Sequence, residues 1–227
     1  MKNFESEILE KIEYTEDVIL LKLSSPDDFT FEAGQFITIE IDREEKKEIK
    51  SYSILNPPSE KGITLCIRLI PGGFASEFFK DVKQGEKLYV KGPLGFFKFQ
   101  DREDIEEFCF LAVGTGIVPM ISMIKEHVED FPNKKFSLIV SYKLRKNMLH
   151  HEELFELEKK YPNFEYHPSI TREEWDGKKG RVTLHLPEVI KGKMFYICGL
   201  KEMVLDTRKT LVERGVDQKD IKQERFS

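Results

Sequence analysis

The sequence predicts two domains in series: a closed antiparallel β-barrel over residues 1–100 and a parallel-sheet α/β domain over residues 101–227. Up to Phe99, short β-branched and apolar segments alternate with turn signals, as is typical of a barrel. After Phe99, continuous apolar segments alternate with segments of helical periodicity, which indicates a parallel sheet covered by helices. A chain of 227 residues has room for two domains of ordinary size.

The barrel half is expected to contain several strands and one short helix. Strand-like segments lie at Glu7–Leu23, Gln35–Ile41, Ile63–Ile70 and Lys87–Val90. Turn signals follow at Ser25–Asp27, Asn56–Pro58, Pro71–Gly73 and Gly92–Gly95. The helix is expected at Ser76–Lys80.

The second half is expected to alternate strands and helices. Buried strands are predicted at 109–114, 136–141 and 194–199, with another in the segment FEYHPSI. Helices are predicted at Val118–Val128, His150–Lys160 and Lys201–Arg214. The charged run 101–107 marks the boundary between the halves, and we expect it and the charged run 43–50 to be exposed loops.

Composition excludes several classes of protein. The chain is 40% hydrophobic and 34% charged, which indicates an ordered domain and not a disordered one. A net charge of −5 argues against nucleic acid as a partner, because phosphate binding needs a basic excess. The acidic N-terminus does not read as a signal peptide. The uncharged run 108–124 is short for a membrane span and is interrupted by Gly114, Gly116 and Pro119.

Cysteines and histidines give no metal signature. Cys66, Cys109 and Cys198 are isolated from one another, whereas zinc and iron–sulfur sites need closely spaced ligands. Low cysteine use favours a reducing, cytoplasmic location. His150 and His151 are adjacent, so a helix would direct them about 100° apart, and we expect a solvated helix start there and no metal site.

Two segments have the pattern of ligand-binding turns at the ends of α/β strands. Gly114–Pro119 follows an apolar strand and opens a helix, where glycines let the backbone approach a pyrophosphate. Pro119 stands where the dinucleotide fingerprint has a third glycine, and an ordinary strand-to-helix turn is the alternative. Cys198 and Gly199 end the last apolar strand, at the sheet edge where such sheets bind ligands. A buried structural cysteine is the alternative there.

Two further segments stand out in the barrel half. Lys50–Ser53 precedes Asn56–Pro58, and it reads either as a binding segment or simply as a polar strand end. Gly72–Ser76 opens the short helix, where free N–H groups and a serine form an anion site, although an ordinary capped helix is the alternative.

The order of these four segments resembles that of the ferredoxin–NADP reductase superfamily, and the resemblance runs from about Leu9 to Phe226. It implies that the barrel binds FAD. In the family motif Arg-x-Tyr-Ser, Tyr52 would pack on the flavin ring, Ser53 would bond near its N5, and Lys50 replaces the arginine that holds flavin phosphate. Lysine keeps the positive charge but lacks the planar guanidinium that bonds a phosphate through two N–H groups, so weaker flavin binding is expected. The remaining residues implied in FAD binding are Arg68, Gly73, Phe74, Ala75 and Ser76.

The same resemblance assigns the second half to a nicotinamide dinucleotide. The implied binding residues are Gly114, Thr115, Gly116, Pro119, Cys198 and Gly199. Cys198 would position the nicotinamide ring without attacking it. In the C-terminal segment, Phe226 would cover the flavin face and Glu224 would exchange a proton near its edge, with a frayed tail as the alternative. Ser53, Cys198, Glu224 and Phe226 are thus the candidate catalytic residues.

The choice between NADPH and NADH depends on groups near the adenosine ribose. The segment from Ser141 continues through Lys143 and Arg145 without an acid until Glu152. Arg172, in Thr-Arg-Glu, matches the Ser-Arg-Glu segment with which relatives that use NADP hold the 2′-phosphate. Some relatives that use NADH also have Thr-Arg there. NADPH is therefore favoured, with NADH as the alternative.

The function implied is transfer of hydride from NAD(P)H to FAD, with electrons passed on to a carrier such as ferredoxin or flavodoxin. An electron-transfer subunit of a larger redox complex is one alternative, and a flavin-binding module without dinucleotide turnover is another. Some relatives carry a C-terminal cysteine cluster for a [2Fe–2S] centre; the 227 residues contain none, so we expect no iron–sulfur domain in this sequence. The electron acceptor and the oligomeric state are left open.

Overall fold

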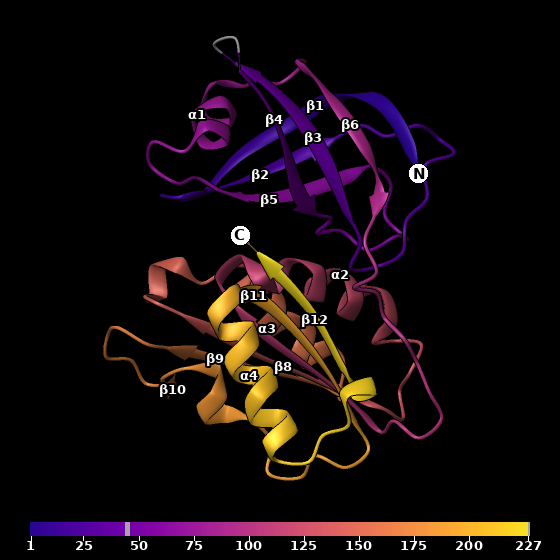
Figure 1. The fold of residues 1–227 in the computed structure, drawn as a ribbon, viewed down its shortest axis with the longest axis vertical. Coiled ribbons are helices and arrows are strands. Elements are labelled where there is room, and N and C mark those ends of the chain that lie inside the picture. The colour runs from indigo at the N-terminus through magenta and orange to yellow at the C-terminus, as the bar shows by residue number, and fades with distance from the viewer. Residues whose placement is uncertain (44–45, 227) are drawn as a thin grey trace. The chain divides into compact units, whose positions relative to one another are not determined.

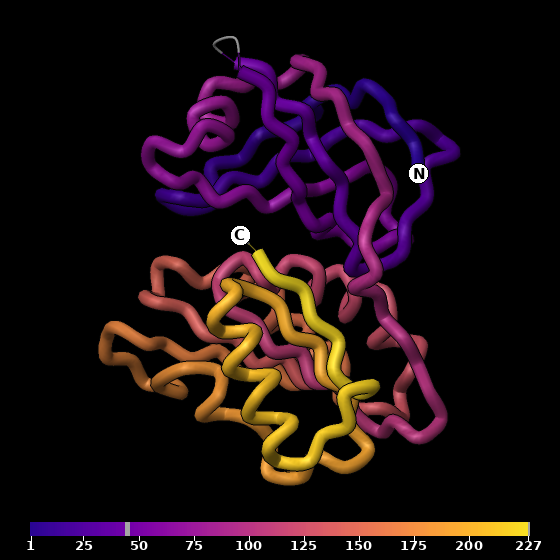
Figure 2. Tube along the Cα trace, in the orientation of Figure 1, coloured from indigo at the N-terminus to yellow at the C-terminus, as the bar shows by residue number. Residues whose placement is uncertain are grey.

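The computed structural model describes residues 1–43 and 46–226. Contacts between Cα atoms divide the chain into two compact units. One unit contains Met1–Phe99 and Ile121–Met123, and the other contains Gln100–Met120 and Ile124–Ser227. The path of the chain through each unit can be followed by colour in Figures 1 and 2.

The first unit is a curled antiparallel sheet of six strands in the order β4-β3-β6-β1-β2-β5. The strands are β1 (Lys2–Thr15), β2 (Val18–Leu23), β3 (Phe36–Arg43), β4 (Lys46–Ser53), β5 (Ile63–Arg68) and β6 (Lys87–Leu94). The two edges approach each other through an isolated bridge between Ile54 and Leu65. The predicted antiparallel barrel is confirmed as a sheet that curls until its edges meet at one end.

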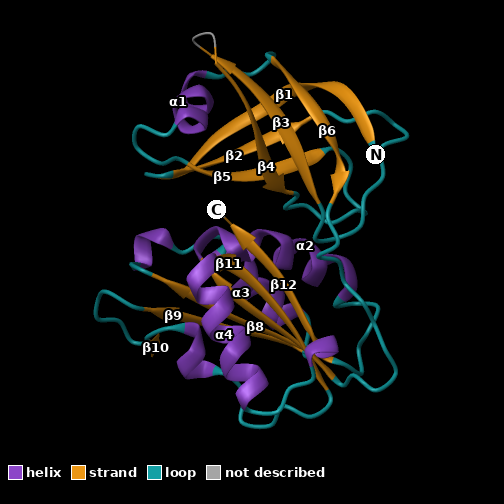
Figure 3. Cartoon of the chain, in the orientation of Figure 1, coloured by secondary structure: helices purple, strands orange, loops and turns teal. Residues whose placement is uncertain are grey.

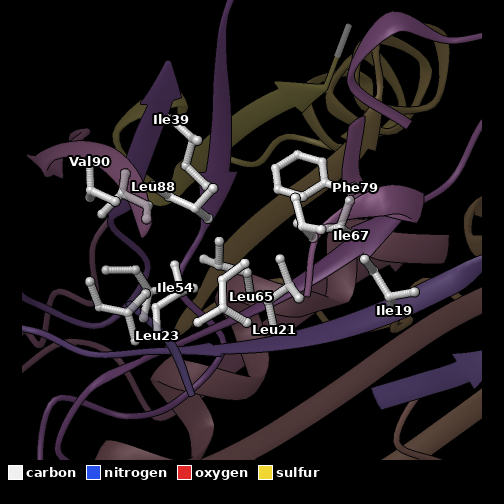
Figure 4. Packing of buried hydrophobic residues seen from close by; sticks show 14 of the residues in the cluster. Ile19, Leu21, Leu23, Ile39, Ile54, Leu65, Ile67, Phe79, Leu88 and Val90 are labelled. Atoms are coloured by element: carbon white, nitrogen blue, oxygen red, sulfur yellow. The ribbon is translucent and has the colours of Figure 1, made fainter. Parts of the chain in front are cut away.

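Alternating apolar residues fill the interior of this sheet (Figure 4). Along β3, Ile37, Ile39 and Ile41 are fully buried, while the residues between them are not. Helix α1 (Phe74–Asp81) contributes Phe79, which is also fully buried in this core. The core therefore fixes α1 against the sheet.

The second unit is a parallel sheet of six strands in the order β10-β9-β8-β7-β11-β12. Its strands are β7 (Glu107–Val113), β8 (Lys135–Tyr142), β9 (Phe164–Ile170), β10 (Lys178–Lys179), β11 (Lys193–Leu200) and β12 (Ile221–Phe226). Its α-helices are α3 (His151–Lys160), α4 (Lys201–Glu213) and α2 (Val118–His127), except that residues Ile121–Met123 of α2 are grouped with the first unit. Short 3₁₀ turns are η1 (Gly114–Ile117), η2 (Arg145–Asn147), η3 (Val182–His185) and η4 (Gln218–Asp220). Figure 3 shows these elements, and the predicted α/β half is confirmed.

Strand β7 is buried on both of its faces, which explains its continuous apolar sequence. On one face Leu111 packs in a cluster with Leu211 of α4. On the other face the ring of Phe110 stacks on that of Tyr196, with the ring centres 5.0 Å apart. The ring centre of Phe136 lies 6.1 Å from that of Phe110. This central strand places the turn that follows it at the carboxyl edge of the sheet.

Three expectations about polar segments were wrong. His150 is not solvated: it is 7% exposed, adopts a positive φ of 54° and bonds Glu153 through Nδ1 at 2.7 Å. The run 101–107 is not all loop, because Glu107 is buried and begins β7. Much of the run 43–50 belongs to β4, and its residues Glu44 and Glu45 lie outside the described residues.

No described helix has the length and apolar character needed to cross a membrane. Nor do the described residues include a group of three or more His, Cys, Asp or Glu side chains arranged to hold a metal ion.

Candidate functional site

The loop before α1 is folded tightly onto the first turn of the helix. Gly72 has a φ of +71°, a conformation that favours glycine. The N–H of Gly73 donates to the Ile70 carbonyl at 2.9 Å, and the Ser76 hydroxyl accepts the Ile70 N–H at 2.8 Å. A Cβ at Gly73 would lie 3.0 Å from the Ile70 oxygen and 3.1 Å from Ser76 Oγ. The glycines therefore keep the backbone bare where the helix begins.

The residues that this loop brings to the start of α1 are Gly73, Phe74, Ala75 and Ser76, all of them predicted from the sequence. The first turn of a helix leaves N–H groups without intrahelical partners, and these groups attract anions. The arrangement can hold a phosphate, with donors supplied by the backbone.

One face of β4 lies along the same helix. Alternation places Lys46, Lys50 and Tyr52 on this face. The Lys46 ammonium lies 4.9 Å from the ring centre of Phe74, and the ring of Tyr52 meets that of Phe79 edge to face at 5.4 Å. Lys50 therefore lies on β4 between two residues that contact α1, on the face of the sheet that the helix covers.

The charged groups on this face of β4 are already paired. Glu48 accepts from Lys46 at 2.5 Å and from Lys50 at 2.6 Å. These two hydrogen bonds lower the pKa of Glu48. The phenol of Tyr52 stays neutral, because burial raises its pKa. Lys46 and Glu48 were missed by sequence reasoning, although the strand alternation from Tyr52 would have found them.

The other predicted residues of the first unit lie at strand ends. Ser53, the last residue of β4, is buried. Arg68 ends β5, and its guanidinium binds the Asp17 carboxylate, with N–O distances of 3.1 and 3.2 Å. In this structure the Arg68 side chain is therefore engaged by a neighbour in the sheet.

In the second unit, the glycine turn packs against the end of a neighbouring strand. Gly114 has a φ of +55°, and a Cβ at Gly116 would lie only 2.3 Å from the Cys198 carbonyl oxygen. Only glycine allows η1 to approach the end of β11 this closely. Pro119 follows in the first turn of α2, where its missing N–H costs no hydrogen bond. The sequence-predicted Gly114, Thr115, Gly116 and Cys198 are thus brought together at the carboxyl edge.

Cys198 is fully buried and pairs in register with Glu224 of β12. Burial and the nearby negative charge of Glu224 raise the pKa of this thiol well above its ordinary value. A neutral thiol is a poor nucleophile. The C-terminal segment is a strand up to Phe226, which pairs with Leu200, and not a frayed tail.

The loops after β8 and β9 are joined beyond the sheet. Thr171 N–H donates to the Tyr142 carbonyl at 3.0 Å, and Arg172 N–H donates to the Lys143 carbonyl at 3.0 Å. These bonds hold the segments that carry Lys143, Arg145 and Arg172, all predicted and all exposed, side by side at the carboxyl edge. Exposed cations on neighbouring loops can bind a phosphate monoester.

Ser141 has a different environment from these cations. It is 2% exposed, and its hydroxyl bonds Ser169 Oγ at 2.7 Å and the Gly180 carbonyl at 3.3 Å. Glu173, the last residue of the Thr-Arg-Glu segment noted in the sequence, accepts the backbone N–H of Arg145. Trp175, which sequence reasoning did not single out, donates its indole N–H to the Lys178 carbonyl at 2.6 Å.

Two family models match the chain, one for each half. The oxidoreductase FAD-binding domain matches residues 5–99, and the oxidoreductase NAD-binding domain matches residues 110–209. The chain belongs to the ferredoxin–NADP reductase superfamily. The predictions of FAD and of a nicotinamide dinucleotide as cofactors are confirmed by these matches.

The curated relatives that the chain matches differ in length. The chain is 32% identical over 219 residues to the phenol hydroxylase P5 protein of Acinetobacter pittii, covering 92% of this chain and 60% of that protein. It is 28% identical over 208 residues to the glycine betaine monooxygenase reductase subunit of Pseudomonas aeruginosa, covering 87% and 57%. It is 26% identical over 211 residues to ferredoxin–NADP reductase B of Sorangium cellulosum, covering 87% and 86%. The chain thus spans about three fifths of the length of the first two of these relatives.

Solved structures share the superfamily fold over nearly the whole chain. A ferredoxin NADP⁺ reductase from Neisseria gonorrhoeae, with bound FAD and NADP, superposes with a TM-score of 0.89 at 24% identity and 99% coverage of both chains. The cytochrome P450 reductase GcoB of Amycolatopsis superposes with a TM-score of 0.91 at 21% identity, covering 99% of this chain and 70% of that one.

Proposed function

We propose that this chain is an NAD(P)H-dependent flavoprotein reductase that passes electrons to a carrier protein or a redox partner subunit. The observation that carries this proposal is the succession, in one chain, of an FAD-binding and an NAD-binding oxidoreductase domain. We assign the first role to residues 1–100 and the second to residues 101–227.

The residues around α1 fit FAD. The bare backbone at Gly73 leaves room that a Cβ would fill, beside the first N–H groups of the helix and the Ser76 hydroxyl. These donors would hold the pyrophosphate, and Lys50 would supply a positive charge. Tyr52 would pack on the flavin ring, and Ser53 would bond near its reactive nitrogen. When bound, FAD supplies a ring that accepts hydride and releases electrons one or two at a time.

The carboxyl edge of the second unit would hold the dinucleotide. The backbone of Gly114–Gly116 would receive the pyrophosphate, and Cys198 with Gly199 would form a wall beside the nicotinamide. The neutral thiol of Cys198 fits a positioning role. Glu224 would exchange a proton, and Phe226 would cover the flavin face. Lys143, Arg145 and Arg172 favour NADPH over NADH.

The acceptor is proposed as a protein. Relatives named as reductase components or subunits of monooxygenases support a partner subunit, and a ferredoxin–NADP reductase supports a small carrier. The lack of a basic excess argues against nucleic acid. A cytoplasmic location remains a prediction from the cysteine pattern.

A visible spectrum tests the proposal. The purified protein, reconstituted with FAD, is expected to show flavin absorbance that bleaches within seconds when NADPH or NADH is added anaerobically. Bound flavin that neither nucleotide bleaches would support the alternative of a flavin-binding module without turnover. A protein that does not retain FAD would contradict the proposal.

A second measurement separates a free-standing reductase from a subunit. Bleached enzyme that is rapidly reoxidised by purified ferredoxin or flavodoxin supports the carrier. Reoxidation only by an oxygenase component that co-purifies with the chain supports the subunit.

A further inference from the structure

The carboxylate of Glu153, in the first turn of α3, bonds two other parts of the second unit. One of its oxygens accepts a hydrogen bond from Nδ1 of His150 at 2.7 Å. The other oxygen lies 3.0 Å from the ammonium of Lys125 on α2. His150 is 7% exposed, and the side chain of Lys125 is 26% exposed. Glu153 therefore links the end of the loop after β8 to helix α2.

The carboxylate is the shared acceptor of both neighbours. The hydrogen bond from His150 and the charge of Lys125 lower the pKa of Glu153 to about 2, although its partial burial acts in the opposite direction. An ionised carboxylate can only accept hydrogen bonds, so Nδ1 of His150 carries a hydrogen. His150 has a φ of 54°, a conformation in which His and Asn are enriched among residues other than glycine.

Helix α2 and the loop after β8 are proposed to hold different parts of the dinucleotide. The helix follows the glycine turn 114–117, which is proposed to receive the pyrophosphate. The loop 143–150 carries Lys143 and Arg145, which are proposed to bind the 2′-phosphate. A nucleotide with both groups binds both parts well only when their separation matches its own.

The end of this loop is also held by bonds that do not involve the carboxylate. The phenol of Tyr142 donates to the Leu149 carbonyl at 3.2 Å, and the Leu154 N–H donates to the His150 carbonyl at 2.9 Å. Loss of the carboxylate is therefore expected to shift the loop relative to α2 and not to unfold it.

We propose that Glu153 is a positioning residue that holds the loop 143–150 and helix α2 at the separation required by a dinucleotide with a 2′-phosphate, with His150 as its partner on the loop. This inference rests on the proposed dinucleotide function of the same edge. Glu153 acts through its two neighbours and not by touching the nucleotide. Its loss should therefore weaken ligands that use both parts more than ligands that use one.

The neighbouring acid supplies a matched control. Glu152 and Glu153 are both exposed and both lie in the first turn of α3. Glu152→Ala and Glu153→Ala thus remove the same charge from the same end of the helix, where acids interact favourably with its dipole. Glu153→Ala also removes the acceptor of His150 and Lys125, which Glu152→Ala leaves in place.

His150 offers a conservative replacement. The amide nitrogen of asparagine can occupy the position of Nδ1 and donate in its place, and asparagine tolerates a positive φ. Glycine tolerates the same φ but has no side-chain donor. His150→Asn is therefore expected to retain the affinity of the wild type for a 2′-phosphate, and His150→Gly is expected to lose as much as Glu153→Ala.

Calorimetric titration with adenosine 2′,5′-bisphosphate and with AMP tests the inference without turnover, because AMP lacks the 2′-phosphate. Glu153→Ala is expected to bind the bisphosphate about fivefold more weakly than the wild type, as for the loss of one hydrogen bond to a charged group. Its affinity for AMP, and both affinities of Glu152→Ala, are expected to change less than about twofold. In steady-state assays, Glu153→Ala is expected to raise KM for NADPH about fivefold and to leave kcat nearly unchanged.

Four results would overturn the inference. They are an unchanged affinity of Glu153→Ala for the bisphosphate, an equal loss for both probes, an equal loss in Glu152→Ala, and equal affinities of His150→Asn and His150→Gly. Wild-type protein that binds both probes equally would overturn it as well, since no contact with a 2′-phosphate would then need positioning. A different result would defeat the proposed function itself: wild-type protein that binds neither probe and whose flavin neither nucleotide bleaches. The two kinds of failure are therefore distinguishable.

Discussion

The Ser76 hydroxyl accepts the backbone N–H of Ile70 at 2.8 Å and so ties the first turn of α1 to the loop that precedes it. The same loop is closed by the bond from the Gly73 N–H to the Ile70 carbonyl. Ser76 is only 6% exposed, and its hydroxyl is used as the acceptor of the Ile70 N–H within this loop. The geometry of the proposed phosphate donors therefore depends on this side chain together with the Gly73 bond.

Replacing Ser76 with alanine is expected to weaken both the fold and the flavin site. The Ile70 N–H loses its acceptor, so the free energy of unfolding should fall by about 1 kcal/mol. The loosened donors should lower FAD affinity by about tenfold. Urea denaturation and fluorescence titration of the apoprotein with FAD measure the two effects. The exposed Ser51→Ala is the control, and equal FAD affinities in the two variants would contradict the role given to Ser76.

Arginine at position 50 is expected to bind FAD more tightly than the native lysine. Lys50 offers a single ammonium, which Glu48 already binds at 2.6 Å. A guanidinium can keep such a partner and still present two N–H groups to a phosphate. Lys50→Arg should raise FAD affinity about threefold to tenfold, and Lys50→Ala should lower it. Lys47→Arg, on the other face of β4, is the control; an affinity for Lys50→Arg no higher than wild type would argue against a phosphate contact.

The strands that are buried on both faces were visible in the sequence as continuous apolar runs. Strands β7 and β11 are continuous apolar runs because helices or other side chains cover each face. The edge strands β4 and β12, with sequences KKEIKSYS and IKQERF, bury little and therefore read as polar segments. Their strand character comes from pairing with a neighbour, which single-strand patterns do not record.

The candidate site divides in the same way. Features that one segment determines, such as the glycines before α1 and after β7, were visible as turn signals. Features that depend on how two distant segments align with each other were not visible in the sequence. The bond from Arg145 to Glu173 exists only because the loops after β8 and β9 continue the alignment of the strands. Nothing in the sequence around either residue indicates that contact.

The two glycines of η1 are expected to differ in their tolerance of alanine. At Gly116 the new Cβ would collide with the backbone of Cys198, which cannot move aside without shifting β11. At Gly114 no atom lies within 4 Å, and only the positive φ is unfavourable. Gly116→Ala should cost about 2–3 kcal/mol and Gly114→Ala about 1 kcal/mol. Urea denaturation measures both; a larger loss at Gly114 would contradict the close packing at Gly116.

A buried ion pair joins the starts of two central strands of the second unit. Glu107 and Lys193 are in register on β7 and β11 and bind each other. The Glu107 carboxylate also accepts from Ser137 Oγ at 2.8 Å and from Cys109 Sγ at 3.2 Å. Burial alone would raise the pKa of Glu107, but the hydrogen bonds from these three neighbours outweigh burial and lower the pKa below its ordinary value of 4.5.

Because the pKa of Glu107 is lowered in the folded state, the free energy of unfolding decreases as the solution is acidified. The ionised pair contributes its full stabilisation above about pH 4.5, where the unfolded carboxyl is also ionised, and loses it as the pH falls through the lower folded-state pKa. Glu107→Gln should reduce the slope with which the free energy of unfolding changes with pH in this acidic range. At pH 7 it should cost about 3 kcal/mol, because Lys193, whose side chain is only 13% exposed, is left without its counter-charge. The double variant with Lys193→Met should recover much of the loss. Urea denaturation at several pH values between 3 and 7 measures the slope; an unchanged slope in Glu107→Gln would show that other carboxyl groups control acid stability.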